Sequence, residues 1–445
     1  MFKKILVANR GEIALRVIRA CKELGIKTVV VYSYEDRESI PVKISDEKIC
    51  IGPSSSDKSY LNIVAIAEAV LQTNADAVHP GYGFLSENPS FAGVCRDLDV
   101  TFIGPPIPVM KHLSNKLEVK KQLKKTNIPT ILGSDGIVQS AGEAKEIAEK
   151  IGYPVLLKAV WGGGGRGLRV IREEENIENA FLAAHEEARV SFGKADIYME
   201  KFIEHPKHVE VQILADKFGN AIHLFERDCT LQRRHQKLLE ESPSPFLSEE
   251  KRKEILDTAP KIARILNYEN VGTIEFLLDE QGNFYFIEVN TRIQVEHPVT
   301  ETCTGIDIMK EQIKLAAGEK LNISQEDVSL KFHSMECRIN AEDERFVPSP
   351  GKIEKLFIPG GPGVRVDTAI YSGCTVTPYY DSLIAKLIVR GNTRNETTER
   401  MKRALDEFIV EGIKTNIQFF KKLISNNRFK NKNYDTNYID RNFSK

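Results

Sequence analysis

Short apolar runs alternate with helically spaced apolar positions over the first part of the chain. Residues 5–8 form a continuous apolar run typical of a buried strand, and residues 13–24 place apolar side chains at helical spacing. Gly25 ends that helix, and a second strand follows over 27–32. Strand, helix and strand in this order predict a βαβ unit. Because the pattern continues, we expect residues 1–115 to form an open parallel α/β domain.

Three further segments follow from the same patterns. Residues 130–203 predict a helix, a strand, a glycine loop and a second strand, and strands then dominate over 204–334. The tail, 335–445, adds short strands and a closing helix over 395–410. The predicted class is α/β plus α+β.

One stretch, FIEVNTRIQVEHP at 286–298, alternates polar and apolar side chains. Period two is typical of a strand, whose successive side chains point to opposite faces. We therefore expect a strand with one polar face, made of Glu288, Asn290, Arg292, Gln294 and Glu296.

The strand before it, 273–279, predicts a hairpin that turns at Gln281-Gly282. If the hairpin is symmetric about that pair, Leu278 faces Tyr285 and Glu275 faces Glu288. Two carboxylates directly opposite one another repel. A divalent cation removes that repulsion, although two glutamates exposed to water would also satisfy the pattern.

The neighbouring side chains fit a magnesium–nucleotide site. Mg²⁺ prefers oxygen ligands and is usually shared between carboxylates and phosphates, so Asn290 would add a ligand to Glu275 and Glu288. Arg292 offers a planar fork for a small anion, and Glu296 would act as a base if its pKa were raised. A basic run adds Arg233, Arg234, His235 and Lys237, which a solvated surface stretch would equally explain.

The glycine loop WGGGGRG at 161–167 lies between two predicted strands. Its Gly162, Gly164 and Gly167 match a dinucleotide fingerprint, but that motif requires a helix after the loop. A Walker A motif also fails, since no Gly-Lys-Ser/Thr follows. A hairpin lid over phosphates remains, with Lys158 on the preceding strand, and a flexible surface turn is the alternative.

Bulk properties narrow the class of protein. The 445 residues are 41% hydrophobic and 28% charged, with a net charge of −1. At ~150 residues per domain this length predicts about three domains. The charge gives no sign of a nucleic-acid or membrane surface, and no apolar stretch reaches the ~18 residues of a membrane helix. The seven scattered cysteines show no zinc spacing, so we expect reduced thiols in a cytoplasmic protein.

Long motifs throughout the chain resemble biotin carboxylase, the ATP-grasp component of biotin-dependent carboxylases. They include ILVANRGEIALRVIRACKELG, HPGYGFLSEN, ERDCTLQRRHQK, FIEVNTRIQVEHPVTE, ECRINAED and VTPYYDSLIAKLI. The resemblance implies an ATP-grasp fold with an N-terminal Rossmann-like domain, a mobile glycine-rich lid and a C-terminal β-rich domain. The sequence departs from the family pattern at Trp161, where family members often have glycine or another small residue.

The resemblance implies a role for each candidate residue. ATP phosphates would be held by Lys116 and Lys158 under the lid residues Gly164 and Gly165. Adenine would be recognised by the hinge of Glu200, Lys201, Phe202 and Ile203, with His208 and His235 lining the nucleotide pocket. Mg²⁺ or Mn²⁺ would be bound by Glu275, Glu288 and Asn290. Bicarbonate would be bound by Lys237, Arg292, Gln294 and the backbone of Val295, with Glu296 as base. Arg338 would stabilise the biotin enolate, and Tyr82 would lie beside the biotin ring.

The implied reaction is the ATP-dependent carboxylation of biotin through carboxyphosphate. No Met-Lys-Met biotinylation signature occurs in the sequence, so we expect biotin on a separate carboxyl carrier protein. Because few residues follow the last carboxylase motif, we also expect a separate carboxyltransferase. The resemblance implies a homodimer. The final acceptor would be acetyl-CoA, with pyruvate, 2-oxoglutarate or propionyl-CoA as alternatives. A carbamoyl-phosphate-forming ligase and a nucleotide-binding regulatory protein are the rival functions.

Overall fold

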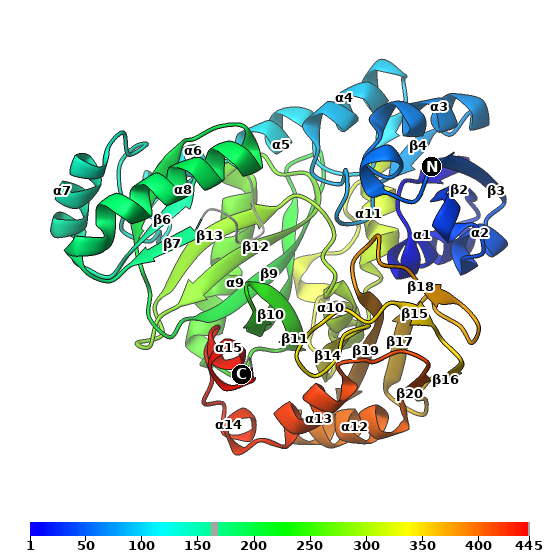
Figure 1. Ribbon diagram of the computed structural model, residues 1–445. Coiled ribbons are helices and arrows are strands. Elements are labelled where there is room, and N and C mark those ends of the chain that lie inside the picture. Colours follow the sequence, from blue (N-terminus) through cyan, green and yellow to red (C-terminus); the bar gives the residue numbers. More distant parts are fainter. Residues whose placement is uncertain (162–167, 444–445) are drawn as a thin grey trace.

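The computed structural model describes residues 1–161 and 168–443, and its N-terminal part is built on a five-stranded parallel sheet (Figure 1). The strand order is β3, β2, β1, β4, β5, with the bounds Lys4–Val7 (β1), Lys27–Ser33 (β2), Glu47–Gly52 (β3), Ala77–His79 (β4) and Thr101–Phe102 (β5). The helices are Gly11–Glu23 (α1), Ile40–Ile44 (α2), Ile63–Thr73 (α3), Pro89–Asp97 (α4) and Ile107–Leu113 (α5). The βαβ unit predicted from residue 5 to residue 32 is confirmed within about two residues at each end.

A three-stranded antiparallel sheet forms a separate small layer, the lid segment, at the far side of the molecule (Figure 1). Its strands are Val155–Ala159 (β6), Leu168–Ile171 (β7) and Ile197–Lys201 (β8), and its helices are Ala141–Ile151 (α7) and Ile177–Phe192 (α8). β6 pairs with β7 as the predicted hairpin. The glycines of that hairpin, including Gly164 and Gly165, lie outside the described residues.

An eight-stranded antiparallel sheet forms the centre of the molecule. Its order is β13, β12, β9, β10, β11, β14, β19, β17. The strands are Lys207–Ala215 (β9), Ala221–Arg233 (β10), Gln236–Ser242 (β11), Asn270–Leu278 (β12), Phe284–Asn290 (β13), His333–Asn340 (β14), Val364–Thr368 (β17) and Leu383–Gly391 (β19). Because β11 pairs with β14, one sheet continues across residues 334 and 335. The predicted domain boundaries stay predictions.

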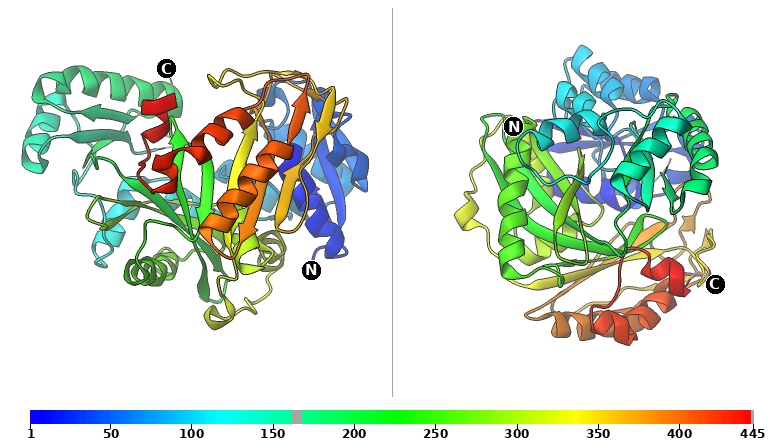
Figure 2. Two further views of the ribbon diagram at one scale, coloured as in Figure 1. Left: turned by 90° about the horizontal axis from the view of Figure 1, so that it is seen from below. Right: turned by 90° about the vertical axis from the view of Figure 1, so that its left-hand side faces the viewer.

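Helices cover this sheet and complete two cores. Glu249–Ile265 (α9) packs on β9 and β10, where Ile255, Ala259 and Ile262 are buried. Arg394–Glu407 (α12) packs on β14 and β19. Figure 2 shows the lid segment and the N-terminal sheet at opposite ends, with the central sheet between them. Within the described residues no helix is long and apolar enough to span a membrane.

Two predictions about the central hairpin are wrong in part. Glu275 does pair with Glu288, but Leu278 pairs with Phe284 and not with Tyr285. A register shift between Glu275 and Phe276 accounts for the difference. The strand predicted over 286–298 ends at Asn290, and residues 291–296 form a loop before helix His297–Thr304 (α10).

The C-terminal end was predicted incompletely. The closing helix expected over 395–410 is α12, and it ends at Glu407. Beyond it come Ile409–Glu411 (β20), Ile417–Ser425 (α13), Asn427–Lys430 (α14) and Tyr438–Phe443 (α15). These helices bury Phe420, Phe429 and Tyr438 against the second half of the central sheet.

Candidate active site

A cavity of about 910 Å³ opens where the N-terminal sheet, the lid segment and the central sheet meet. It is lined by nearly all the described residues that the sequence singled out, namely Tyr82, Lys116, Lys158, Glu200, Lys201, Phe202, Ile203, His208, His235, Lys237, Glu275, Glu288, Asn290, Arg292, Gln294, Val295 and Arg338. Glu296 lies beneath the lining and is fully buried.

Two lysines line one part of the cavity, and each is paired with a glutamate. Lys116, the first residue of helix Lys116–Lys124 (α6), places Nζ 2.5 Å from Glu288 Oε2. Lys158, on β6, places Nζ 3.0 Å from Glu200 Oε2. Cations from two different elements therefore line the wall where phosphates would bind, and each has a carboxylate partner that a phosphate would have to replace.

Glu200 at the end of β8 is held by two lysines. Besides Lys158, Lys120 on α6 lies 2.7 Å from Glu200 Oε1. Burial raises the pKa of Glu200, but Lys158 and Lys120 outweigh it and hold the pKa below its usual range. The sequence analysis missed Lys120, although its spacing of four from Lys116 puts both on one face of α6.

The hinge residues join the lid segment to the central sheet. Lys201 donates from Nζ to the carbonyls of Gly152 and Tyr153 at 2.9 and 2.7 Å. Phe202 donates its backbone N–H to Pro154 at 3.1 Å. Hence the chain direction at 200–203 is fixed by backbone contacts, and these residues border the cavity.

The paired carboxylates on β12 and β13 are the strongest candidates for metal ligands. Glu275 is buried and is contacted by His208 Nε2 at 3.1 Å, Lys237 Nζ at 2.9 Å and Asn290 Nδ2 at 2.8 Å. Glu288 is paired with Lys116 across the cavity. Two carboxylates and an amide oxygen are the hard oxygen donors that suit Mg²⁺. The donor set therefore fits the ion that the sequence predicted.

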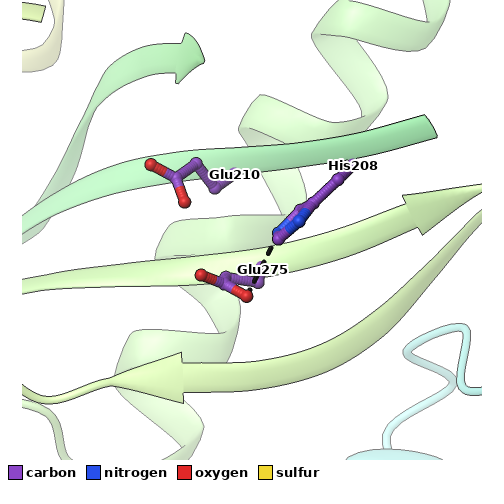
Figure 3. A group of neighbouring side chains, drawn as sticks. All are labelled: His208, Glu210 and Glu275. Carbon is purple, nitrogen blue, oxygen red and sulfur yellow. Dashed lines mark ion pairs between the residues drawn. The ribbon is translucent and has the colours of Figure 1, made fainter. Parts of the chain in front are cut away.

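Glu210 is a further carboxylate of this wall, which the sequence analysis missed. His208 and Glu210 extend from β9, and Glu275 extends from the adjacent β12, with ligand atoms within 4.8 Å of one another (Figure 3). Lys237 contacts both Glu210 and Glu275, so its ammonium group offsets part of the negative charge of these two carboxylates. The signal was present, because polar side chains alternate along β9 at His208, Glu210 and Gln212.

Lys237 on β11 is the centre of the charge network. Its Nζ contacts Glu210, Glu275 at 2.9 Å and Glu296 at 2.8 Å. Burial lowers the pKa of Lys237, but the three carboxylates outweigh it and raise the pKa well above its usual range. Lys237 is therefore a permanent cation at the floor of the cavity.

Glu296 carries its charge rather than holding a proton. Burial raises its pKa, but Lys237, Arg338 and Arg227 outweigh burial and hold the pKa well below its usual range. The predicted role of Glu296 as a base is conditional on a raised pKa, and here cations from three strands surround the carboxylate and hold its pKa low.

An anion-binding corner lies on the loop that follows β13. Arg292 contacts Glu87 at 3.1 Å and Gln294 Oε1 at 2.9 Å. Gln294 is buried, and its Nε2 has no hydrogen-bond partner within the described residues. A buried donor without a partner is costly. A small anion between Gln294 and Arg292 would satisfy it.

Arg338 and Tyr82 also line the cavity. Arg338 on β14 places Nε 2.6 Å from Glu240 and Nη2 2.8 Å from Glu296. Tyr82 donates its hydroxyl to Glu12 on α1. If Tyr82 and Arg338 bind biotin as expected, the biotin wall is formed by the loop after β4 and by β14.

Trp161 directly precedes the glycines of the lid loop and is the last described residue before them. Its Nε1 donates to Asp196 at 2.8 Å, and Lys194 Nζ lies 3.7 Å from the ring centroid. The side chain also packs against Leu117, Val160 and Tyr198, and it lines the cavity.

Comparison with known proteins agrees with this geometry. Three family models match consecutive parts of the chain. They describe a biotin carboxylase N-terminal domain at residues 1–110, a carbamoyl-phosphate synthase L chain ATP binding domain at 115–324, and a biotin carboxylase C-terminal domain at 336–441. A Nostoc biotin carboxylase is 52% identical over 440 residues, which is 98% of each chain.

Two solved structures are similar over almost the whole chain. A Campylobacter jejuni biotin carboxylase described as a β,γ-ATP complex has a TM-score of 0.97 at 50% identity, covering 99% of both chains. The biotin carboxylase domain dimer of Hydrogenobacter thermophilus 2-oxoglutarate carboxylase, described with MgADP and bicarbonate, has a TM-score of 0.95 at 50% identity, covering 99% of this chain and 98% of that one. The predicted ATP-grasp fold is confirmed, and the chain belongs to the biotin carboxylase family.

Proposed function

We propose that the protein uses ATP to carboxylate biotin with bicarbonate, giving carboxybiotin, ADP and phosphate. The observation that carries this proposal is the position of Glu296. Its Oε1 lies 2.8 Å from Lys237 in the bicarbonate corner, and its Oε2 lies 2.8 Å from Arg338 in the biotin wall. One carboxylate therefore lies between a residue proposed to bind bicarbonate and the residue proposed to face biotin.

The first step joins bicarbonate to phosphate. Arg292, Lys237 and the free amide of Gln294 hold the anion, while Lys116 and Lys158 hold the nucleotide phosphates. Glu296 takes the bicarbonate proton, and the oxygen attacks the γ-phosphorus to form carboxyphosphate and ADP. Catalysis here rests on positioning and charge neutralisation. Mg²⁺ held by Glu275, Glu288 and Asn290 would neutralise phosphate charge.

Binding of bicarbonate prepares Glu296 to act as a base. A second anion beside Lys237 shares that cation and adds negative charge near Glu296. Both effects raise the pKa of the carboxyl group toward the range in which it can accept a proton. Substrate binding thus makes up for the low pKa that Lys237 and Arg338 impose.

The second step transfers the carboxyl group. Carboxyphosphate separates into CO₂ and phosphate, and the phosphate takes the ureido N–H proton of biotin. The nitrogen then attacks CO₂, while the guanidinium of Arg338 stabilises the oxyanion of the ureido group, as donors of an oxyanion hole do. Tyr82 packs beside the biotin ring.

A coupled assay tests the function. Purified protein with MgATP and bicarbonate should release ADP much faster when free biotin is added, and labelled bicarbonate should appear in carboxybiotin. ADP release that ignores biotin but responds to ammonia would indicate a carbamoyl-phosphate-forming enzyme. Absence of any turnover would indicate a regulatory protein.

We assign the protein to the first half-reaction of acetyl-CoA carboxylase, with a separate biotin carboxyl carrier protein and carboxyltransferase. The similar domain from a 2-oxoglutarate carboxylase supports the alternative of another acceptor. That protein is described as a dimer, which supports a homodimer here. Proteins that co-purify with the chain identify the acceptor, and light scattering measures the oligomeric state.

A further inference from the structure

Lys386 is a fully buried lysine in the middle of β19. In the sheet it lies opposite Arg338 on β14, beside the proposed biotin wall. It does not line the cavity and has no place in the reaction described above. A buried ammonium group is costly to maintain without partners, so its contacts indicate what it does.

The partners of Lys386 come from two distant parts of the chain. Its Nζ lies 3.0 Å from Glu12 Oε1 on α1. The same Nζ donates to the carbonyl of Val295 at 3.0 Å. That carbonyl belongs to the peptide bond that leads into Glu296. Lys386 therefore holds the backbone at the residue that we propose as the base.

Glu12 extends the contact to the biotin wall. Its Oε1 accepts a hydrogen bond from the hydroxyl of Tyr82, and it is also the atom that contacts Lys386. One oxygen thus joins the tyrosine on the loop after β4 to the lysine on β19. Glu12 is fixed on α1, whose inner face is packed by Ile13 and Val17.

Stability alone is a weak reason for this ion pair. A buried ion pair is often no more stabilising than well-packed apolar side chains of similar volume. Apolar side chains could not accept the Tyr82 hydroxyl, however, and could not donate to the Val295 carbonyl. The pair instead fixes the loop that carries Val295 relative to the loop that carries Tyr82.

We propose that Lys386 and Glu12 form a positioning pair, in which Lys386 fixes the Val295–Glu296 peptide and Glu12 fixes Tyr82. The pair keeps the bicarbonate loop and the biotin wall at a constant separation. Lys386 does not line the cavity, and Glu12 borders it beside Tyr82. The role that we assign to each is the position of its neighbour, Val295 for Lys386 and Tyr82 for Glu12. This inference rests on the proposed function, because it assigns the pair to that site.

The inference predicts a selective kinetic defect. Lys386→Met and Glu12→Ala should each lower kcat/KM for biotin and raise the KM for bicarbonate by about tenfold or more. The KM for ATP and the affinity for MgADP should change less than about twofold, because the nucleotide end is held by other elements. Glu12→Gln keeps an acceptor oxygen for Tyr82 and should recover most of the loss in biotin use.

Arg16→Met is the matched control. Arg16 lies on the same helix, is also buried, and contacts Glu301 at 2.8 Å, but neither Val295 nor Tyr82 is among its partners. This variant should lose stability without a selective effect on either substrate. If Lys386→Met and Glu12→Ala match it, or raise all three KM values equally, the positioning role is wrong.

The variants also separate the two hypotheses. A wild-type protein that does not use biotin rejects the proposed function itself. If wild type uses biotin and Glu12→Gln is no better than Glu12→Ala, only the positioning pair is rejected. Should Lys386→Met fail to fold, the two Glu12 variants still decide.

Discussion

Glu296 owes its low pKa to residues that the proposed reaction would engage. Lys237 and Arg338 each contact one of its oxygens at 2.8 Å. In the proposed reaction Lys237 also holds bicarbonate, and Arg338 also faces the biotin oxygen. When the substrates contact these cations, the cations stabilise the ionised form of Glu296 less, and the pKa of Glu296 would rise. The base is therefore strongest when both substrates are bound.

Arg338→Ala should abolish biotin carboxylation while leaving nucleotide binding intact. Loss of an oxyanion donor typically costs about 10²–10³-fold in rate, and we expect at least that in labelled carboxybiotin formation. The Kd for MgADP and the affinity for bicarbonate, measured by calorimetry, should stay near the wild-type values, since the ion pairs of Arg338 are with Glu240 and Glu296 and not with the residues proposed to hold phosphate or bicarbonate.

Because Arg338 also neutralises Glu240 at 2.6 Å, its loss should also lower stability. The double variant Arg338→Ala/Glu240→Gln removes that unpaired carboxylate and should recover stability without recovering activity. An equal fall in MgADP affinity in both variants would contradict the assignment of Arg338.

Glu336 should make the protein less stable as the pH rises. It lies opposite Glu240 across β11 and β14, and neither of its oxygens has a hydrogen-bond partner within the described residues. Burial raises the pKa of Glu336 well above its usual range, with Lys386 opposing and Glu240 adding to the shift. A carboxyl whose pKa is raised by folding stabilises the fold below its unfolded pKa, and this stability is lost as the pH rises through the folded pKa.

Glu336→Gln removes that titration. The free energy of unfolding of the variant relative to wild type should increase from pH 5 to pH 9, by ~1.4 kcal/mol for each unit by which folding raises the pKa of Glu336 within that range. Urea unfolding at a series of pH values measures it. A constant difference across the series would show that Glu336 is ionised in the folded protein.

At the scale of elements, the paired glutamates were predicted correctly for an incomplete reason. Counting outward from Gln281-Gly282 assumes a symmetric hairpin. In the structure Asp279 closes a five-residue loop by accepting from the backbone of Gln281 and Asn283 at 3.0 and 2.8 Å, which moves the centre by half a residue. The register shift beyond Phe276 then restores the pairing of Glu275 and Glu288. Neither feature is visible in the period of the sequence.

The polar alternation failed beyond Asn290 because it described a site and not a strand. Arg292 and Gln294 are held by each other and by Glu87 from the N-terminal part, and Val295 by Lys386. Period two predicts a strand wherever side chains alternate between two environments, whatever the backbone does. Here tertiary contacts supply those environments, and they come from parts of the chain that no local window includes.

The C-terminal helices should depend on one buried carboxylate. Glu241 on β11 contacts Arg394 at 2.7 Å and accepts from the Tyr434 hydroxyl at 3.0 Å. Burial raises its pKa, but Arg394 and His333 outweigh burial and lower the pKa to about 2. Removing one partner from a buried ion pair typically costs about 3–5 kcal/mol. Arg394→Met should destabilise the protein by about that amount at pH 7.

The double variant Arg394→Met/Glu241→Gln is the matched test. It leaves no charge uncompensated, so a double-mutant cycle in urea should show a coupling of at least about 1 kcal/mol between the two positions. Additive losses would mean that Glu241 is neutralised by other groups, and that the C-terminal helices are held by apolar packing alone.

At the scale of the whole molecule, the site could be predicted as a set of residues but not as a shape. Lys116, Lys158, Glu275 and Arg338 lie on four elements, and the cavity is lined by residues of the N-terminal part, the lid segment and the central sheet. Long motifs identified those side chains. Sequence could not show that Glu210 and Lys237 fill the space between them, or that Lys386 and Glu12 connect the sheets.

Closure around a metal–nucleotide complex should stabilise the whole molecule. A ligand that binds only the folded state at 100 times its Kd adds about 2.7 kcal/mol to the free energy of unfolding. We expect MgADP to raise the thermal midpoint by a few degrees and EDTA to remove most of that gain, since Glu275 and Glu288 would then face the phosphates without a cation between them. Differential scanning calorimetry with and without EDTA measures both effects. Glu275→Gln/Glu288→Gln should lose the Mg²⁺-dependent part, whereas Asp279→Asn in the loop of the same hairpin should keep it, because Asp279 is not part of the cavity wall. A Mg²⁺-dependent gain that survives in the double variant would place the ion away from the two paired carboxylates.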